Sequence, residues 1–494
     1  MTPSRSTRAG IRKDDGFVAC PSLLRTCSRA PHVSARAFIA TLALSVSLQG
    51  AAQADTQEPA APVSAASHKR PVPNYDGRPP APTPLKEDLL WVPRLVLSPL
   101  YLVSEFAIRR PLSVAIPAAE KIDLFTKIYD FFTFGPDHKI GIFPIALAEF
   151  DFKPSVGFFA FWSDAGFSGD DLSLHAEAWP DDWFGASVKQ RVKVDERHTV
   201  ELEVSEMHRP DRVFYGVGPN SLESSESRYA LQEIDGSVAY EWRSWRSSRI
   251  ETMLGARDVY VTNGAYVGDP SLTAEAATGA FSVPFGFGRE YTAEYNRVVA
   301  AVDTRVQESR RGSGVRLELD GEQGSDLRNA PASSWVRYGA TVGAYVDLTG
   351  YRRVLGATVT TQLADPLRGA DVPFTELVSL GGDHPMRGFY TGRLVGRSAA
   401  VATASYTWPI GPWIDGDLQL ALGNVFGEHL EDLSARLLRF SGALGVSVGG
   451  LQKTAVMGSQ DAPLEFLIGV GSETFAHGGQ IDSLRVTAGV PLSF

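Results

Sequence analysis

Several short stretches of this chain carry residue types that catalyse reactions in other proteins. Asp383 is followed by His384, an acid and a base that suit a hydrolase when a serine completes the site. The sequence does not indicate which serine that would be. We therefore expect His384 to take part in the packing of its own loop, and a hydrolase is the least favoured interpretation.

Two other kinds of motif, pairs of aspartates and pairs of glycines, can also be explained without a catalytic or binding role. The adjacent aspartates Asp170–Asp171 and Asp181–Asp182 suit calcium ligands or paired catalytic acids, but solvated loop carboxylates have the same pattern. The glycine pairs in Tyr215–Gly218 and Phe285–Gly288 do not continue into a phosphate-binding fingerprint, and hairpin turns use such glycines. We predict no catalytic residue, no metal site and no cofactor.

The elements that position these residues begin after an export signal. An apolar run, Ala37–Leu48, follows three arginines and precedes the small residues Ala52 and Ala54, which predicts a signal peptide with a long leader over residues 1–54. The only cysteines, Cys20 and Cys27, lie inside it, so the predicted mature chain has no thiol. The net charge of −10 argues against a nucleic-acid partner.

The remaining chain divides into three parts. Residues 55–85 are rich in proline and alanine and predict an extended linker. Residues 86–139 predict short amphipathic helices, periplasmic or lumenal, because prolines interrupt their apolar pattern. Residues 140–494 predict strands, since apolar and polar residues alternate in segments such as Thr199–Ser205 and Gly314–Asp320.

These segments predict an all-β fold, a transmembrane antiparallel β-barrel of about 16 strands at roughly 22 residues per strand and connection. No predicted mature segment is an apolar run of the length that a membrane helix needs. Only helices and closed barrels satisfy every backbone group in lipid, so a membrane location requires a closed barrel. A soluble sandwich or propeller would also alternate.

The C-terminal segment favours the membrane alternative. Thr487, Gly489, Leu492 and Phe494 follow the spacing polar-x-Gly-x-x-apolar-x-aromatic, which predicts an assembly signal for an outer-membrane barrel. Every second residue before Phe494 is apolar, as a strand between lipid and a wet lumen requires. Pro491 removes one backbone donor from this strand, so we expect a weak seam between the last and first strands.

Three internal stretches carry a family resemblance. Leu380–Phe389 ends in Met386, Arg387, Gly388 and Phe389, and this sequence resembles the loop signature of the BamA/TamA superfamily of outer-membrane insertases and translocases, the bacterial surface antigen family. Leu420–Phe426 and Arg212–Ser221 resemble two further stretches of that family, in the same order. The resemblance covers roughly residues 211–494.

The resemblance implies a loop that folds into the lumen and an arginine that pairs with acids on the inner wall. Ala421 and Ser405 replace the two acidic residues that the family usually has there. By the period of two, Asp417 and Gln419 share the inner wall with Ala421, and we predict that Arg387 bonds Asp417, Gln419 or loop carbonyls. Typical members also carry N-terminal POTRA domains, for which residues 86–134 are too short.

The function implied by the resemblance is assistance in the insertion or translocation of protein or lipid at the bacterial outer membrane. The expected partners are outer-membrane lipids, including lipopolysaccharide, and the assembly machinery that inserts the barrel itself. The client or cargo is not readable from the sequence. The alternative is a passive pore or structural surface barrel without a client, and an outer-membrane hydrolase comes third.

Overall fold

A computed structural model describes the residues of the barrel in the ranges 121, 124–135, 137–180, 183–306, 312–329, 333–368, 371–383, 385–410, 414–448 and 464–490. The predicted signal peptide 1–54, the linker 55–85 and the predicted helical residues 86–120 lie outside these ranges. The same is true of Pro491, Leu492 and Phe494.

The larger of the two sheets in the described residues has 17 strands, in which the two-residue β1 (Thr133–Phe134) accompanies sixteen longer strands. All neighbours in the sheet pair antiparallel, and β9 pairs with β10 while β19 pairs with β2, so the sheet closes on itself. The predicted barrel and strand number are thus confirmed. The sixteen strands are β2 (Ile140–Glu149), β3 (Ser155–Trp162), β4 (Asp170–Trp179), β5 (Trp183–Lys193), β6 (His198–Phe214), β7 (Ser227–Arg243), β8 (Arg249–Asn263), β9 (Glu290–Asp303), β10 (Gly314–Asp326), β11 (Ser334–Asp347), β12 (Val354–Arg368), β15 (Ser398–Pro409), β16 (Ile414–Phe426), β17 (Arg439–Val448), β18 (Leu464–Ser472) and β19 (Ile481–Gly489).

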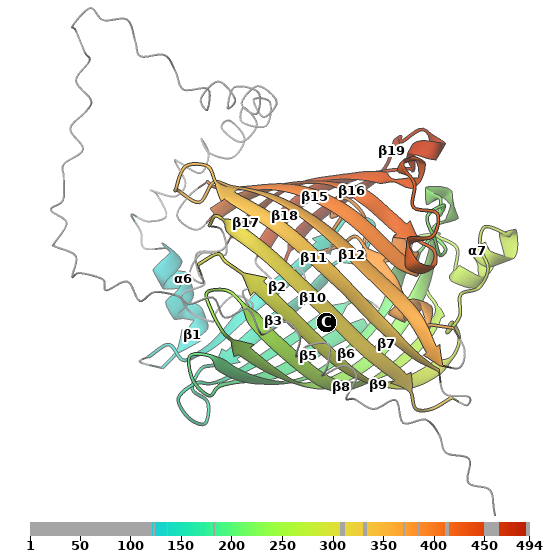
Figure 1. The fold of residues 1–494 in the computed structure, drawn as a ribbon. Helices are drawn as coiled ribbons and strands as arrows, with labels where there is room; N and C mark the ends of the chain where they lie inside the picture. The colour runs from blue at the N-terminus through green and yellow to red at the C-terminus, as the bar shows by residue number, and fades with distance from the viewer. Residues whose placement is uncertain are drawn as a thin grey trace, which may run out of the picture. The chain divides into compact units, whose positions relative to one another are not determined.

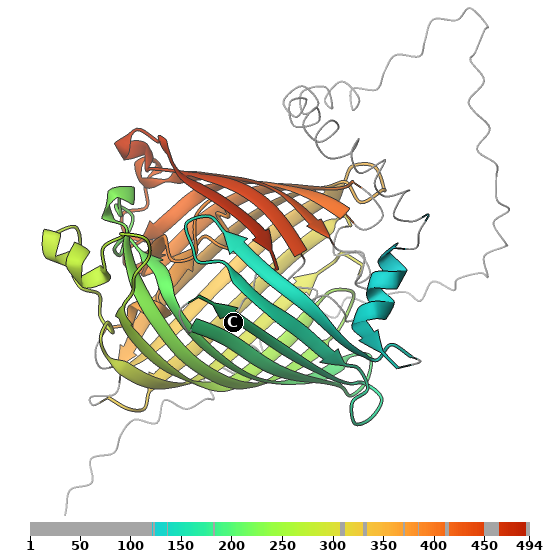
Figure 2. The same cartoon turned by 180° about the vertical axis from the view of Figure 1, so that it is seen from behind.

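The closure brings the first and last strands side by side, teal beside red in Figure 2. The loops 264–289 and 369–397 are the longest connections between described strands, and both lie at the end where β19 begins. Outer-membrane barrels have short periplasmic turns and longer extracellular loops. We therefore refer to this end as the extracellular end and to the opposite end as the periplasmic end.

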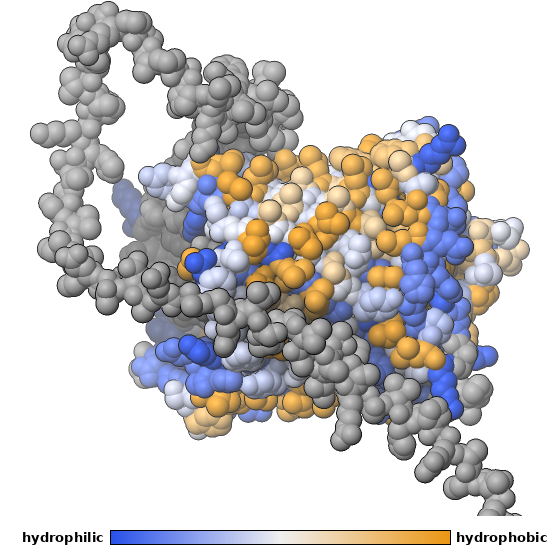
Figure 3. Space-filling view, viewed as in Figure 1, coloured by the Kyte–Doolittle hydropathy of each residue, from blue (hydrophilic) through white to orange (hydrophobic). Residues whose placement is uncertain are grey.

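The strands alternate between an apolar outer face and a polar inner face, as lipid and a wet lumen require. Leu317, Leu319, Leu420 and Leu422 are exposed on the outside. Figure 3 shows apolar residues over the outer wall, with hydrophilic residues gathered toward the extracellular end. On the inside, the Lys189 ammonium pairs with Glu203 at 3.1 Å. Among the described residues, no helix is long and apolar enough to cross a membrane.

Few helices accompany the strands in the described part of the chain. The α-helices are α6 (Leu124–Phe132) and α7 (Leu272–Thr278), and the 3-10 turns are η2 (Glu223–Ser225), η4 (Phe374–Glu376), η5 (Glu428–Leu430), η6 (Ala435–Leu437) and η7 (Phe475–His477). Tyr129 and Phe132 of α6 pack against Phe143 and Phe161 on the inner face of β2 and β3. The helix thus lies at the periplasmic end of the first strands (Figure 1).

Candidate functional site

The long loop that carries the Met386–Phe389 motif packs against the inner wall of the barrel. This lumenal loop (residues 369–397) contains η4 and the short hairpin β13 (Val378–Leu380) and β14 (Leu394–Gly396). Met386 and Phe389 have no exposed surface and join a core cluster with wall residues such as Val401 and Ala421. Burial of such large apolar side chains stabilises the loop inside the barrel.

Glycines allow the loop to approach the wall closely. A Cβ on Gly388 would lie 2.0 Å from the Val470 carbonyl oxygen, and one on Gly471 would lie 2.3 Å from the Phe389 ring. Both distances are well inside van der Waals contact. The Gly388 amide donates to the Ser441 hydroxyl at 2.9 Å. Gly388 and Phe389, which follow Arg387 in the sequence, therefore contact the wall directly and place Arg387 beside it.

Arg387 contacts acidic and amide side chains from two strands. Its guanidinium lies 3.5 Å from the Asp417 carboxylate of β16 and donates to Glu465 of β18. Its backbone amide donates to the Gln419 side-chain oxygen at 3.3 Å. The Arg387 side chain is 15% exposed and that of Glu465 is 8% exposed, so this charge pair is largely removed from water.

The structure thus brings Arg387 together with both residues named from the sequence, and it adds Glu465. Phe466 and Ile468 are exposed on the outer face of β18, so Glu465 lies on the inner face by the period of two. This alternation was visible in the sequence. The distance between β18 and the loop tip was not, because the sequence does not give the position of a long loop relative to a strand 78 residues away.

The other end of the lumenal loop is attached to the opposite side of the barrel. Glu376 of η4 lies 3.4 Å from Arg257 of β8 and 3.7 Å from Arg337 of β11. It also accepts a hydrogen bond of 2.9 Å from the Tyr291 hydroxyl of β9. Ion pairs at both ends therefore hold the loop across the lumen.

The seam, by which we mean the pairing of β19 with β2, is short within the described residues. Across the described residues the two strands pair only at Thr487↔Glu149, Ala488↔Ala148 and Gly489↔Leu147. Two further backbone bonds flank them, from Phe150 N to Val486 O at 2.8 Å and from Val490 N to Ala146 O at 3.3 Å. Two residues of the predicted assembly signal, Thr487 and Gly489, therefore lie at the seam.

Side chains reinforce the seam on its inner side. Arg485 of β19 donates to Glu149 of β2 at 2.6 Å and to the Gly382 carbonyl of the lumenal loop at 2.8 Å. The Tyr390 hydroxyl donates to the Leu484 carbonyl at 2.8 Å, while its ring packs edge-on against Phe152 at 5.1 Å. The lumenal loop thus contacts β19 and the turn that follows β2.

The residues that suggested catalysis have structural roles where they are described. Asp170 accepts hydrogen bonds from Gln190 and the Gly166 amide, and Asp171 pairs with Lys193 at 3.0 Å. Asp181, Asp182 and His384 lie outside the described residues. The pattern Gly-x-Ser-x-Gly occurs at residues 445–449, but Ser447 lies within the extended strand β17 and not on the sharp turn that such a nucleophile needs.

Comparisons with known proteins agree with the predicted family. The model of the Omp85 superfamily domain matches residues 297–456, which confirms the resemblance at the level of the superfamily. Solved structures with a similar arrangement include BamA from Haemophilus ducreyi lacking POTRA domains 1–3, at 13% identity and a TM-score of 0.47 over 71% of this chain and 70% of that chain. Another is CdiB from Acinetobacter baumannii, at 11% identity and a TM-score of 0.44 over 72% and 60% of the two chains. No curated protein sequence matches this one.

Proposed function

For an outer-membrane barrel that carries an Omp85 superfamily domain, we propose a role in inserting or translocating protein or lipid at the outer membrane, by opening of the seam. The observation that carries the proposal is the short pairing of β19 with β2. Three register pairs join these strands in the described residues, whereas ten join β16 and β17. Among the described residues, opening this joint disrupts far fewer backbone hydrogen bonds than opening the joint between β16 and β17.

The lumenal loop also favours a lateral route over a passive pore. It is anchored at Glu376 on one side of the barrel and at Arg387 on the other. A solute that crossed the lumen here would have to pass this loop or displace it. Of the contacts of the loop, a client that enters the membrane between β19 and β2 would have to break only those with β19, such as the contacts of Gly382 and Tyr390.

The outer surface fits the partners that this role requires. Exposed leucines and valines on the outer face suit contact with the acyl chains of outer-membrane lipids, lipopolysaccharide included. We propose these lipids, and the assembly machinery that inserts the barrel, as partners. The N-terminal residues 1–54 and 55–85 act in this proposal as export signal and linker.

The test is a disulfide that locks the seam. Ala148 and Ala488 are register partners on the outer face, and the predicted mature chain has no other thiol. We expect the Ala148→Cys/Ala488→Cys variant, once oxidised, to remain a folded barrel and to fail to complement a strain depleted of this protein, with growth restored by reduction. The readout is growth together with the composition of the outer membrane.

A second disulfide is the matched control. Phe466 and Ala488 are register partners on β18 and β19, so the Phe466→Cys/Ala488→Cys pair locks a joint that is not expected to open. This oxidised variant should keep full activity. Full activity of the seam-locked barrel would instead contradict lateral opening and favour a passive pore, which a conductance measurement in planar bilayers would then detect.

A further inference from the structure

A cluster of charged residues holds the turn after the first strand. Arg228, the second residue of β7, has no exposed side-chain surface, and its Nη2 atom lies 2.7 Å from Asp151 in the turn between β2 and β3. Its guanidinium also lies 2.7 Å from Glu226 and 2.7 Å from Asp269. The same guanidinium carbon lies 5.1 Å from the Phe152 ring centroid. We call these residues the first-strand cluster.

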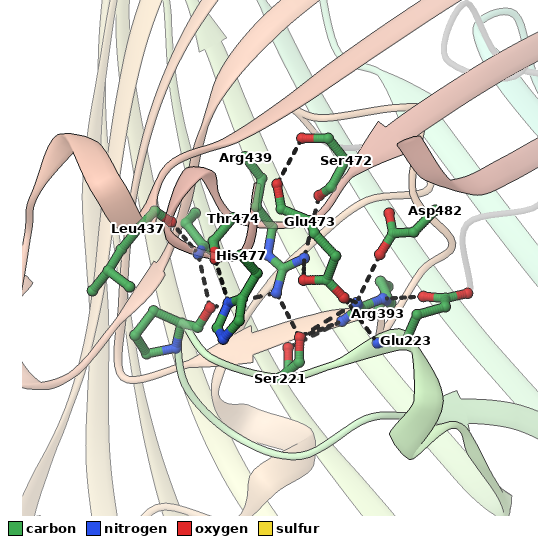
Figure 4. A network of polar contacts seen from close by, with 12 residues as sticks. Ser221, Glu223, Arg393, Leu437, Arg439, Ser472, Glu473, Thr474, His477 and Asp482 are labelled. Atoms are coloured by element: carbon green, nitrogen blue, oxygen red, sulfur yellow. Dashed lines mark hydrogen bonds and ion pairs between the residues drawn. The ribbon is translucent and has the colours of Figure 1, made fainter. Parts of the chain in front are cut away.

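A second cluster holds the connection before the last strand (Figure 4). Arg393 and Arg439 have no exposed side-chain surface. Arg439 donates to Glu473, between β18 and β19, at 2.9 Å, and Arg393 donates to Glu223 at 2.8 Å. The Glu473 carboxylate also accepts a hydrogen bond of 3.1 Å from the Glu223 backbone amide. We call these residues the last-strand cluster.

The two clusters share one short stretch of chain. Both arginines of the last-strand cluster donate to the Ser221 carbonyl, Arg393 at 3.4 Å and Arg439 at 2.5 Å. Ser221 and Glu223 therefore belong to one cluster, while Glu226 and Arg228 belong to the other. Residues 221–228 run from a contact with the segment before β19 to a contact with the segment after β2, at the extracellular end of the seam.

We propose that residues 221–228 form a strap that holds the extracellular end of the seam closed and must be released on at least one side before the seam opens. The strap regulates the opening proposed above, and its importance for activity rests on that proposed function. The existence of the strap does not depend on the proposed function, because the contacts form within the barrel itself.

The contacts of the strap are strong, but they are non-covalent and can be broken without unfolding the barrel. The strap holds each side through buried arginines that contact two or more acceptors, and removing one member of such a group leaves charges buried without a partner. The covalent chain is unchanged on release, and the freed carboxylates lie near the extracellular water, which can solvate them. Release therefore does not require the barrel itself to unfold.

The test measures the width of the seam directly. Pro154 follows the first strand and the exposed Ile481 begins the last, so spin labels on Pro154→Cys and Ile481→Cys report the distance across the extracellular end. With the strap intact, we expect one narrow distance distribution in lipid nanodiscs. In Arg228→Met we expect a second population, longer by at least one strand spacing, about 4.8 Å.

A matched control separates the strap from a general loss of buried charge. Arg305 is also buried, pairs with Asp303 at 2.6 Å and stacks on Tyr345, but it lies near the periplasmic end of β9. Arg305→Met should leave the label distances unchanged. If Arg228→Met yields no folded barrel, Glu223→Gln weakens the strap from the other side with no change in size, and it should produce the same longer population.

Distances that stay narrow in a folded Arg228→Met barrel, or in Glu223→Gln where that variant replaces it, would overturn the strap. The result is independent of the proposed function, because no client is present. Longer distances combined with full activity of the seam-locked barrel would leave the strap standing and the function wrong. Unchanged distances combined with loss of activity in the seam-locked barrel would contradict the strap and support the proposed function.

Discussion

The wall formed by β6, β7 and β8 and the seam between β19 and β2 are held together by different kinds of bond. Strands β6 and β7 pair at fifteen positions, and β7 and β8 pair at fifteen more, so the backbone holds the wall. The seam has three such pairs in the described residues, and side chains such as Arg485 and Tyr390 supplement them. Backbone hydrogen bonds between strands do not depend on the identity of the side chains, whereas a single substitution can remove a side-chain contact.

The largest effect is expected at Arg387, because its substitution leaves two wall carboxylates without their cation. Breaking a buried ion pair costs about 3 to 5 kcal/mol, so Arg387→Ala should lower the unfolding free energy of the barrel by about that amount and make the lumenal loop sensitive to proteases. Chemical denaturation in detergent micelles measures the first. The control is Lys193→Ala, whose pair with Asp171 is exposed and should be worth under about 1 kcal/mol. Equal effects of the two substitutions would show that the ion pairs of Arg387 do not stabilise the lumenal loop more than an exposed pair does.

A smaller effect is expected at Arg485, which bonds both Glu149 and the Gly382 carbonyl. Charged hydrogen bonds contribute about 1.5 to 3 kcal/mol, so Arg485→Met should speed amide exchange at the seam roughly a hundredfold at most. The comparison variant is Arg191→Met, on the inner wall, where Arg191 pairs with Glu201 at 2.7 Å. Strands β5 and β6 share ten register pairs, so their amides should remain protected. Equal loss of amide protection at the seam and between β5 and β6 would show that the number of backbone pairs does not determine the sensitivity to losing a side-chain contact.

The Tyr390 hydroxyl offers a finer comparison. Tyr390→Phe removes one hydrogen bond to the Leu484 carbonyl and keeps the ring against Phe152, so about 1 kcal/mol should be lost. Exchange of the β19 amides near Leu484 should rise about fivefold. Tyr295→Phe removes a comparable bond of 2.9 Å to Asp235 on the wall and should leave exchange at the seam unchanged. An unchanged seam in Tyr390→Phe would mean that the ring alone makes the contact.

The smallest expected effect is a dependence of the strap on pH. Burial raises the pKa of the Glu226 carboxyl from its ordinary 4.5 to about 7, against the opposing effect of Arg228 and with the help of Asp151 and Asp269. Arg228, Asp151, Asp269 and Glu223 face the Glu226 carboxyl, and Tyr266 stacks on Arg228.

A raised carboxyl pKa means that the folded strap binds this proton more tightly than the released one. The resulting stability is fully present below pH 4.5 and is lost as the pH rises through about 7. The label distances across the seam should therefore be narrower at pH 5.5 than at pH 8.5. Glu226→Gln should reduce the difference, and a strap that tightens on raising the pH would contradict this assignment.

Much of the barrel could be predicted from the sequence, because alternation fixes which face of a strand each residue occupies. The same rule placed Asp417 and Gln419 on the wall that Arg387 contacts. Pairings across long loops follow no such period. Glu465 and the contacts of residues 221–228 depend on where loops of 29 and 12 residues fold back, which a single sequence does not specify.

The short strands beside the seam have a consequence for the surrounding bilayer. Strand β3 has eight residues and its neighbours β2 and β4 have ten each, whereas β6 and β7 have seventeen each. At 3.3 Å per residue and a tilt of about 40°, β3 spans a height of about 20 Å, less than the roughly 25 Å of a usual apolar belt. Lipids beside β3 must therefore compress their chains or tilt to avoid exposing them to water. The hydrophobic mismatch falls next to the seam, which has three register pairs in the described residues. A thinner membrane there presents a smaller barrier to an entering segment.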